Sequence, residues 1–586
     1  MTKKISDLTR RERDVLVALC KPVLRSDAFT EPASIREVAD TLGISDAAVK
    51  QHFLRLYDKF ELYDGEERRR LKLANLVLTA GVVSRADLGA AAAEPAAAKA
   101  AETAATGAEP SDALAAGREA ARFRNWERAY ERLSVADQAQ SPLGAADLET
   151  LGEAAVWSGR NEESIAARQR AYAIHEREGN SRRAAAVALG LVVNNVVRLN
   201  FSLASGWLAK AKRHLEGQPP CAELGYYVMT EALFALAQGN SEVGLERARV
   251  AFASGTRHGD NDLRALGLVF QGYALAQLGR LPEAVPMLDE AMASAIAGEL
   301  GPLATGIVYC RTVCACLEAF DYRRAFDWTE AIAHVAGDSC TAGYPGDCRA
   351  HQASILVFRG EWAKGEDEAR AASRESERFD LAHSGLALYE IGQIRLRSGD
   401  LDGAAGAFKQ ALELGMNPQP GLALLQLARG DVEAATISIH GAIEETAPES
   451  LRRARLLPTQ VDIASASGDP AAARLAAEEL ARIADKWPIA ALRSAAEGAL
   501  GVTTLMEGDH AAAVRRLRQA YRLWREVDAP YEAARTRVHL ARALGSLGDT
   551  ASARLELEAA LTSFDRLGAR LDAERANAAL AAASGA

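Results

Sequence analysis

A short phrase of glycine followed by a polar residue recurs through most of this 586-residue chain, mostly at intervals of about 40 residues or twice that. The instances are Gly159-Arg160, Gly239-Asn240, Gly279-Arg280, Gly360-Glu361, Gly399-Asp400, Gly430-Asp431, Gly468-Asp469, Gly508-Asp509 and Gly548-Asp549. Where the interval doubles, Asn200 or Asp321 stands in the expected place without its glycine. Recurrence at this period predicts an array of stacked repeats.

The phrase has a physical basis in the way a helical hairpin is closed. Glycine accepts the left-handed conformation that ends one helix, and the following Asp or Asn accepts backbone N–H bonds at the start of the next. A small residue then lets the paired helices approach closely, and we assign this role to Ala284, Ala404, Ala434, Ala473 and Ala513. We therefore expect roughly 11 or 12 hairpins between residues 113 and 586.

Composition agrees with this interpretation. Apolar residues make up 49% of the chain and aromatic residues only 6%, because Ala and Leu dominate. Both favour helix, so we predict an all-α fold.

The length exceeds what a single hydrophobic core supports, so we expect more than one domain or an open array. The formal net charge of −10 belongs to the repeats, because the first 88 residues are slightly basic.

Residues 89–112 separate the repeats from an N-terminal segment. Ala dominates this stretch, Pro95 and Pro110 interrupt it, and it contains no large apolar residue that could anchor it to a core. We read it as a linker between a domain at 1–88 and a repeat domain at 113–586.

The N-terminal segment has the pattern of a small helical domain. Amphipathic helices are predicted over 8–19 and 34–42, followed by a tight turn at Gly43-Ile44 and a third helix from Ser45 to about Phe60. Its apolar positions, Val49, Phe53, Leu56 and Phe60, recur at helical spacing and should face the core. Two helices joined by a tight turn form a helix-turn-helix, whose second helix enters the major groove of DNA.

The opposite face of that third helix supplies the candidate DNA contacts. We assign Ser45, Ala47, Lys50, Gln51 and Arg55 to the DNA-binding site. Lys50, Gln51 and Arg55 are the side chains able to donate to base edges or phosphates. The charged run at 68–72 could touch phosphate, or it could simply be the solvated end of a fourth helix.

This stretch resembles the LuxR-type helix-turn-helix through 8–16, through Leu42-Gly43-Ile44-Ser45 and through 48–52. Its long first loop and its ending at 81–88 are closer to the segments that accompany forkhead-associated domains in actinobacterial proteins. The resemblance implies DNA contact by Lys50, Gln51 and Arg55.

The repeats resemble the tetratricopeptide superfamily, in the longer form found in MalT-like and LuxR-type regulators. The phrases that carry this resemblance are 308–310, 323–330 and 359–362. It implies a superhelix of helical hairpins with a surface for protein or small-molecule partners, without specifying the ligand.

Other kinds of site find little support. Cys310, Cys314, Cys316, Cys340 and Cys348 lie near His334 and His351, but without a CxxC pair we interpret the thiols as buried structural residues and predict no metal and no cofactor. No GxxxxGK, GxSxG or HExxH phrase occurs, so we predict no catalytic residues and no enzyme activity.

The chain has no apolar run of membrane-spanning length and no signal-peptide pattern at its start, and its seven cysteines are odd in number. We expect a cytoplasmic protein that does not bind membranes. The leading hypothesis is a bacterial transcription regulator that binds promoter DNA and has a protein or small-molecule effector on its repeats, with a homodimer as one arrangement. The alternative is an interaction scaffold whose helix-turn-helix domain does not bind DNA.

Overall fold

The computed structural model describes residues 15–20, 32–33, 35–42, 49, 52–53, 56–57, 59–60, 73–74, 76–77, 110–138, 143–336 and 346–584. Every regular element within these residues is a helix, which confirms the expected all-α fold. The chain divides into two compact units, Met1–Asp112 and Ala113–Ala586.

The N-terminal unit has a small apolar core of its own. Its one full helix in the described residues is α3 (Ile35–Leu42), which matches the second predicted helix. Val49, Phe53, Leu56 and Phe60 are all buried in this core, so the predicted inward face of the third helix is confirmed. These four positions recur every three or four residues, which places their side chains on one side of a helix.

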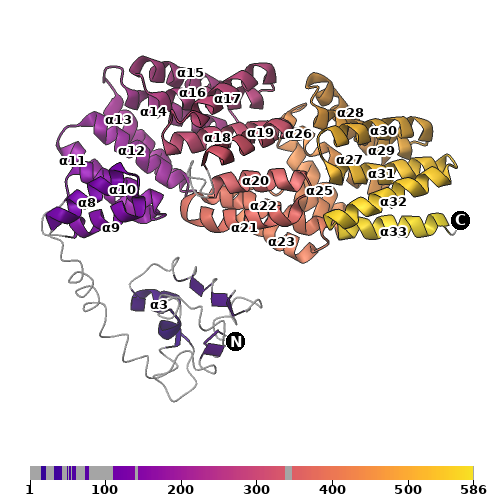
Figure 1. Cartoon of the computed structure of the whole chain (residues 1–586), viewed down its shortest axis with the longest axis horizontal. Helices are drawn as coiled ribbons and strands as arrows, with labels where there is room; N and C mark the ends of the chain where they lie inside the picture. The colour runs from indigo at the N-terminus through magenta and orange to yellow at the C-terminus, as the bar shows by residue number, and fades with distance from the viewer. Residues whose placement is uncertain are drawn as a thin grey trace. The chain divides into compact units, whose positions relative to one another are not determined.

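The second unit is an α-solenoid of twelve hairpins and a final helix, within the described residues (Figure 1). This agrees with the expected number. The first six hairpins are α8 (Pro110–Arg122) with α9 (Trp126–Asp137), α10 (Ala145–Trp157) with α11 (Asn161–Arg177), α12 (Ser181–Val196) with α13 (Phe201–Leu215), α14 (Ala222–Ala237) with α15 (Ser241–His258), α16 (Asn261–Gln277) with α17 (Leu281–Ile296), and α18 (Pro302–Glu318) with α19 (Tyr322–Ala336).

The remaining hairpins complete the array. They are α20 (Asp347–Phe358) with α21 (Trp362–Phe379), α22 (Leu381–Arg397) with α23 (Leu401–Glu413), α24 (Gly421–Ala428) with α25 (Val432–Glu444), α27 (Leu457–Ser467) with α28 (Pro470–Lys486), α29 (Ala490–Met506) with α30 (His510–Glu526), and α31 (Pro530–Ser546) with α32 (Thr550–Leu567). The short α26 (Leu451–Ala454) precedes α27, and α33 (Arg570–Ser584) ends the chain.

Nine hairpin turns in the described residues have the predicted glycine, and at six of them an Asp or Asn side chain caps the following helix. Arg160, Arg280 and Glu361 make no such capping bond. All nine glycines of the recurring phrase have positive φ, between 69° at Gly159 and 88° at Gly508. Asp400 is representative of the caps, since its carboxylate accepts the backbone N–H of Gly403 at 2.9 Å. Each such bond satisfies an N–H that would otherwise lack a partner at the helix start.

Two details of the repeat differ from the sequence prediction. Where glycine is missing, Leu199 and Phe320 themselves take positive φ, 61° and 62°. Ala435 rather than Ala434 is the fully buried small residue of α25. Ala435 stands four residues after the cap at Asp431, as Ala404 does after Asp400, whereas Ala434 is one residue too early to face the paired helix. The other four assigned alanines are fully buried, as predicted.

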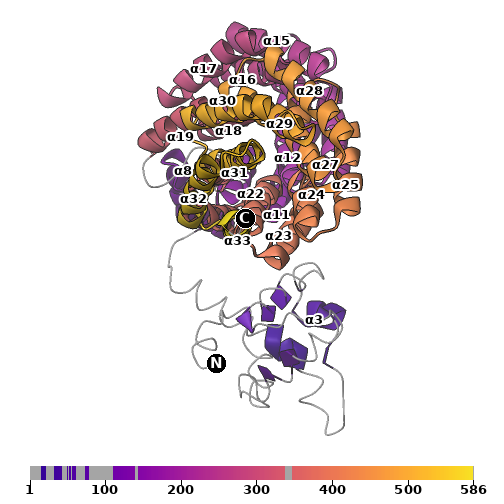
Figure 2. The ribbon, with the colours of Figure 1, turned by 90° about the vertical axis from the view of Figure 1, so that its right-hand side faces the viewer.

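The first helix of each hairpin lies on the inner side of the solenoid. Figure 2 shows the first helices α16, α18 and α22 nearer the centre than the second helices α15, α17 and α23. First helices of successive hairpins also contact one another, as α16 and α18 do. Side chains on first helices therefore share an inner surface.

Successive turns of the solenoid contact each other at the hairpin ends. The backbone N–H of Leu381 donates to Val197 at 3.0 Å, and Arg198 reaches the carbonyl of Glu377, 179 residues further along the chain. The indole N–H of Trp487 likewise donates to the backbone carbonyl of Gly279. In each case the turn inside one hairpin packs on the connection between two later hairpins, which couples distant repeats.

Candidate functional site on the inner face of the solenoid

The inner face between α16 and α31 gathers aromatic and charged side chains from hairpins far apart in sequence. We use "inner face" below for Tyr273, Arg311, Glu318, Tyr322, Tyr389, Glu390 and Arg455. Arg455 connects two of the helices, because its positive charge acts on the ionisation of Tyr322 on α19 and of Tyr389 and Glu390 on α22. These helices thus face a common space.

Arg455 is the most accessible cation of the inner face. It is exposed and hydrogen-bonds Tyr322, whose ring stacks on Phe358 with a centroid distance of 3.6 Å. Arg455 forms no salt bridge with any carboxylate in the described residues. No carboxylate in the described residues therefore occupies its remaining guanidinium donors.

Arg311 is the second such cation. Its guanidinium lies over the rings of Phe270 and Tyr273, at 5.8 and 5.6 Å from their centroids. Tyr273 in turn donates its hydroxyl to Glu318 at 3.1 Å. Like Arg455, Arg311 makes no salt bridge within the described part of the chain, so aromatic stacking positions it and leaves its charge without a carboxylate partner.

Glu390 provides a buried carboxyl beside these cations. It is 8% exposed and accepts the hydroxyl of Ser354 at 2.7 Å. Burial raises the pKa of Glu390, against the opposing effects of the Ser354 hydrogen bond and of Arg397 and Arg455. The result is a carboxyl whose charge is only partly offset by its neighbours.

Further charged and aromatic side chains lie on α31, next to the inner face. Arg535 forms an ion pair with Asp462 at 2.6 Å, and Tyr531 donates to Asp572 at 2.8 Å. Burial, with the positive charges of Arg542 and Arg535, lowers the pKa of His539 to about 4, although Asp462 opposes the shift. His539 is therefore neutral near pH 7.

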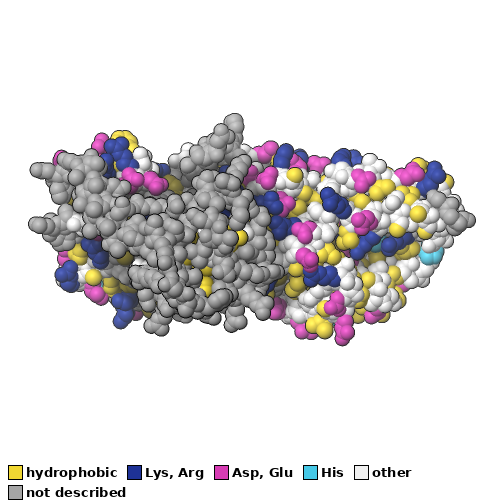
Figure 3. Space-filling model, turned by 90° about the horizontal axis from the view of Figure 1, so that it is seen from below, with side chains coloured by type: hydrophobic (Ala, Val, Ile, Leu, Met, Phe, Trp, Pro, Cys, Tyr) yellow, Lys and Arg dark blue, Asp and Glu magenta, His cyan; other side chains and the backbone are white. Residues whose placement is uncertain are grey.

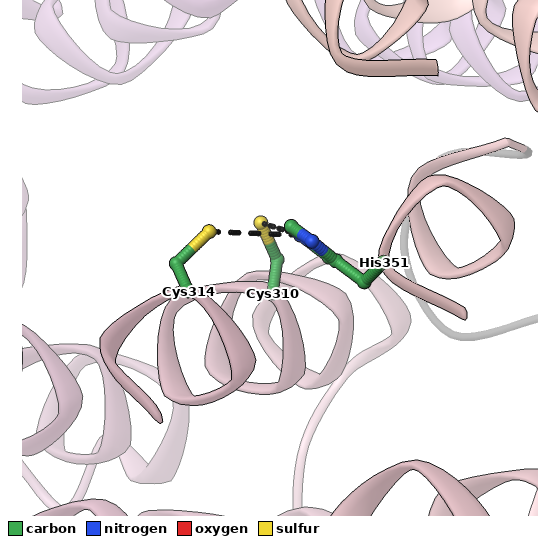
Figure 4. A group of neighbouring side chains, drawn as sticks. All are labelled: Cys310, Cys314 and His351. Atoms are coloured by element: carbon green, nitrogen blue, oxygen red, sulfur yellow. Dashed lines mark hydrogen bonds between the residues drawn. The ribbon is translucent and has the colours of Figure 1, made fainter. Parts of the chain in front are cut away.

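Two thiols and one imidazole form a cluster that joins α18 and α20 (Figure 4). Cys310 and Cys314, one turn apart on α18, both direct sulfur toward Nε2 of His351 on α20, at 3.2 and 3.6 Å. The three donor atoms lie within 4.8 Å of one another. His383 on α22 adds a fourth donor, with Nε2 3.3 Å from Cys310 Sγ.

These thiols differ in their surroundings. The hydrogen bond from Cys310 lowers the pKa of Cys314, assisted by Arg311 and Arg455, against burial and Glu318. Cys316 points into the apolar core of the solenoid, as expected from its helical position, and burial raises the pKa of its thiol. None of the six described cysteines forms a disulfide, and Cys314 is the only one of them that is not buried.

A largely apolar cavity of about 550 Å³ lies where Trp487 meets the earlier turn. Its lining includes Leu281, Val285, Leu288 and Ala315. On the face shown in Figure 3, the described surface carries basic and acidic side chains interspersed, with no block of one charge. The cavity offers few polar groups, and the surface in Figure 3 offers no concentrated charge. The inner face, which has both aromatic and charged side chains, is therefore a better candidate for selective binding than either of them.

The predicted DNA-contacting residues Ser45, Ala47, Lys50, Gln51 and Arg55 lie outside the described residues, as does Cys340. Sequence reasoning paired the cysteines with His334 and His351 but missed His383. It also missed Arg455 and Glu390. The i, i+4 spacing of Cys310 and Cys314 was the one available signal, since the histidines are 41 and 73 residues away from Cys310.

No family model matches the chain, and no curated protein matches it. Among solved structures it is similar to the crystal structure of the APC/C hetero-tetramer Cut9-Hcn1, with 12% identity over 81% of this chain and 98% of that chain and a TM-score of 0.35. The apo form of the quorum sensor NprR from B. thuringiensis has 11% identity over 64% of this chain and 97% of that chain, with a TM-score of 0.31. The human IFIT1 dimer with m7Gppp-AAAA has 15% identity over 71% of this chain and 99% of that chain, with a TM-score of 0.35.

These TM-scores are low, so we draw no conclusion about function from the similarities. The fold of the second unit itself defines an α-helical repeat protein built from tetratricopeptide-like hairpins. Among the described helices, none combines the length and the apolar character required to cross a membrane.

Proposed function

We propose that the solenoid is a non-catalytic interaction scaffold whose inner face binds an extended segment of a partner protein that carries acidic side chains. The observation that carries this proposal is the pair Arg311 and Arg455. Both cations lie on the inner face among tyrosines, and neither has a carboxylate partner in the described residues.

Chemistry supports an acidic peptide as the ligand. A guanidinium presents a fork of N–H donors that matches a carboxylate, and a partly desolvated pair is stronger than an exposed one. Tyrosines beside it supply rigid contact area and hydroxyls for backbone groups. Glu318 and Glu390 would repel additional carboxylates, which restricts where acidic side chains can sit.

The test begins with selection of peptides from a random displayed library on the full-length protein. Enriched sequences should contain Asp or Glu, and Arg455→Gln or Arg311→Gln should weaken their binding about tenfold or more, which corresponds to about 1.4 kcal/mol. Arg249→Gln on the outer helix α15 removes the same charge at an exposed position and should have no effect. Enrichment without acidic residues, or equal binding by all variants, would refute the proposal.

A second function is supported by the N-terminal unit. Burial of Val49, Phe53, Leu56 and Phe60 on one side of the third helix is the arrangement that a helix-turn-helix requires. We propose that the opposite side, with Ser45, Ala47, Lys50, Gln51 and Arg55, binds promoter DNA in a cytoplasmic transcription regulator. The solenoid would then bind the effector, or hold two chains together as a homodimer.

This second proposal is tested by selecting genomic DNA fragments with the purified protein at moderate salt. Enrichment of a single motif is expected, and Lys50→Ala combined with Arg55→Ala should abolish it because phosphate and base contacts dominate affinity. Lys409→Ala combined with Arg554→Ala removes equal charge from exposed outer helices and serves as the control. If the wild-type protein selects no motif, the DNA-binding proposal is refuted and only the scaffold function remains.

A further inference from the structure

Cys310, Cys314 and His351 have the spacing of ligands around one metal ion. In a tetrahedral zinc site, Zn–S bonds of about 2.3 Å and Zn–N bonds of about 2.0 Å place sulfur and nitrogen about 3.6 Å apart. The distances from the two sulfurs to His351 Nε2 are 3.2 and 3.6 Å. Figure 4 shows both sulfurs converging on the same edge of the imidazole.

His351 is an unusual residue for a plain protein core. Its side chain is 1% exposed, its Nδ1 has no hydrogen-bond partner, and the thiols are the polar groups facing its Nε2. The lack of a partner at Nδ1 costs about 1–3 kcal/mol whichever group Nε2 binds. A bond from Nε2 to a metal would stabilise the buried imidazole more than weak hydrogen bonds to sulfur do.

His383 is oriented as a metal ligand would be. Its Nδ1 contacts Asp380 Oδ2 at 3.0 Å, and the Nε2 on the other side of the ring lies 3.3 Å from Cys310 Sγ. With a proton on Nδ1 donated to the carboxylate, Nε2 presents its lone pair on the side of Cys310 Sγ. Carboxylates that hold ligating histidines in this way are common around zinc.

We propose that Cys310, Cys314 and His351 bind a Zn²⁺ ion, with His383 as the fourth ligand. Two thiols each release one proton and two neutral imidazoles each contribute a lone pair, so the loaded site is electrically neutral. A neutral centre suits this largely buried position. The donors are two sulfurs and His351 Nε2, which lie within 4.8 Å of one another, together with His383 Nε2, which contacts Cys310 Sγ at 3.3 Å. Sulfur and imidazole nitrogen favour zinc over harder cations such as Mg²⁺ or Ca²⁺.

The ion would connect three consecutive hairpins. Its ligands lie on α18, α20 and α22, which are first helices on the inner side of the solenoid. Metal binding would fix the angles between these helices and hold Arg311, which lies between Cys310 and Cys314 in the chain. The inference does not depend on the proposed peptide or DNA function, because its measurements detect the metal alone.

The test uses the full-length protein, stripped with a chelator under reducing conditions and titrated with Zn²⁺ against a chromogenic chelator. One ion per chain is expected. Cys310→Ser, Cys314→Ser and His351→Ala should each weaken binding by about 100-fold or more, and Asp380→Asn by about 10-fold or more. Cys316→Ser is the matched control, because this buried thiol on the same helix points away and should bind zinc as the wild type does.

Co²⁺ gives a second readout that does not depend on variants folding. The wild-type protein with Co²⁺ should show thiolate-to-cobalt charge-transfer absorption and the intense visible bands of four-coordinate cobalt. Far-ultraviolet circular dichroism checks that each variant keeps its helices. Absence of the charge-transfer band, or equal zinc affinity in the Cys310→Ser/Cys314→Ser double variant, would overturn the proposal.

Discussion

Trp487 donates its indole N–H to the backbone carbonyl of Gly279, which lies 208 residues earlier in the chain. Gly279 closes the turn of one hairpin, and Trp487 begins the connection between two later ones. The contact joins two successive turns of the solenoid. Gly279 therefore has a role in tertiary packing that its place in the recurring phrase does not reveal.

Gly279→Ala should therefore be more destabilising than the same change at another repeat turn. Both Gly279 and Gly239 have positive φ, 73° and 79°, so an added Cβ costs about 1–2 kcal/mol at either position. At Gly279 that Cβ would also lie 2.1 Å from Trp487, whereas nothing lies within 4 Å of it at Gly239. We expect an additional loss of about 1–3 kcal/mol, measured by urea unfolding.

A double-mutant cycle separates the two contributions. In a Trp487→Ala background the extra cost of Gly279→Ala should fall to that of Gly239→Ala. An unchanged extra cost would mean that strain within the turn, and not the contact between turns, is responsible.

Phe320→Gly should destabilise the protein even though glycine suits the local backbone. Relief of the left-handed conformation gains about 1–2 kcal/mol, but the loss of a Phe side chain from a core costs about 3–5 kcal/mol. Phe320 is 8% exposed and belongs to the core shared with later repeats. Chemical denaturation should show a net loss of about 2 kcal/mol.

Leu199→Gly is the matched comparison, because Leu199 has the same backbone conformation but is only half-buried. Its two effects should nearly cancel, within about 1 kcal/mol. A large stabilisation by Phe320→Gly would show that the contact between turns contributes little.

Ala435→Leu should cost about 1–3 kcal/mol, since Ala435 is fully buried between the helices of its hairpin. Ala434→Leu, one residue earlier, should change stability by less than about 0.5 kcal/mol because that side chain is partly exposed. Thermal unfolding of the two variants distinguishes the observed register of α25 from the one that sequence alone predicted. Equal effects at both positions would contradict it.

Stability should decline as pH falls from about 6.5 to about 4. His539 has its ordinary pKa of about 6.5 in the unfolded chain but a pKa of about 4 in the folded protein, where it faces Arg535, Arg542 and Asp462. Between these values the unfolded chain binds a proton that the folded chain does not, so acid favours unfolding. At about 1.4 kcal/mol per pKa unit, the loss approaches about 3.5 kcal/mol and stops below pH 4.

Urea unfolding at several pH values measures this slope. His539→Gln should reduce it, while His440→Gln, at an exposed position on α25, should not. The same slope in His539→Gln as in the wild type would assign the pH dependence to other groups.

The sequence alone was sufficient to predict the hairpins, because the forces that end and begin helices are local. Gly399 and Asp400 show this: left-handed backbone and side-chain capping depend only on neighbouring residues, and both occur as predicted. The inward face of the third N-terminal helix was also predictable, since helical spacing alone separates Val49 and Phe53 from the other side. The DNA contacts at Lys50 and Arg55 remain a prediction.

Only the tertiary structure decided which residues meet across the solenoid. Cys310 and Cys314 lie one helical turn apart, but His383 reaches them only because α18, α20 and α22 stack with a particular twist. Likewise Arg455 faces Tyr322 because the solenoid curves back on itself. That curvature is the sum of small rotations between many hairpins, each set by packing of its own side chains, so no local pattern in the sequence encodes it.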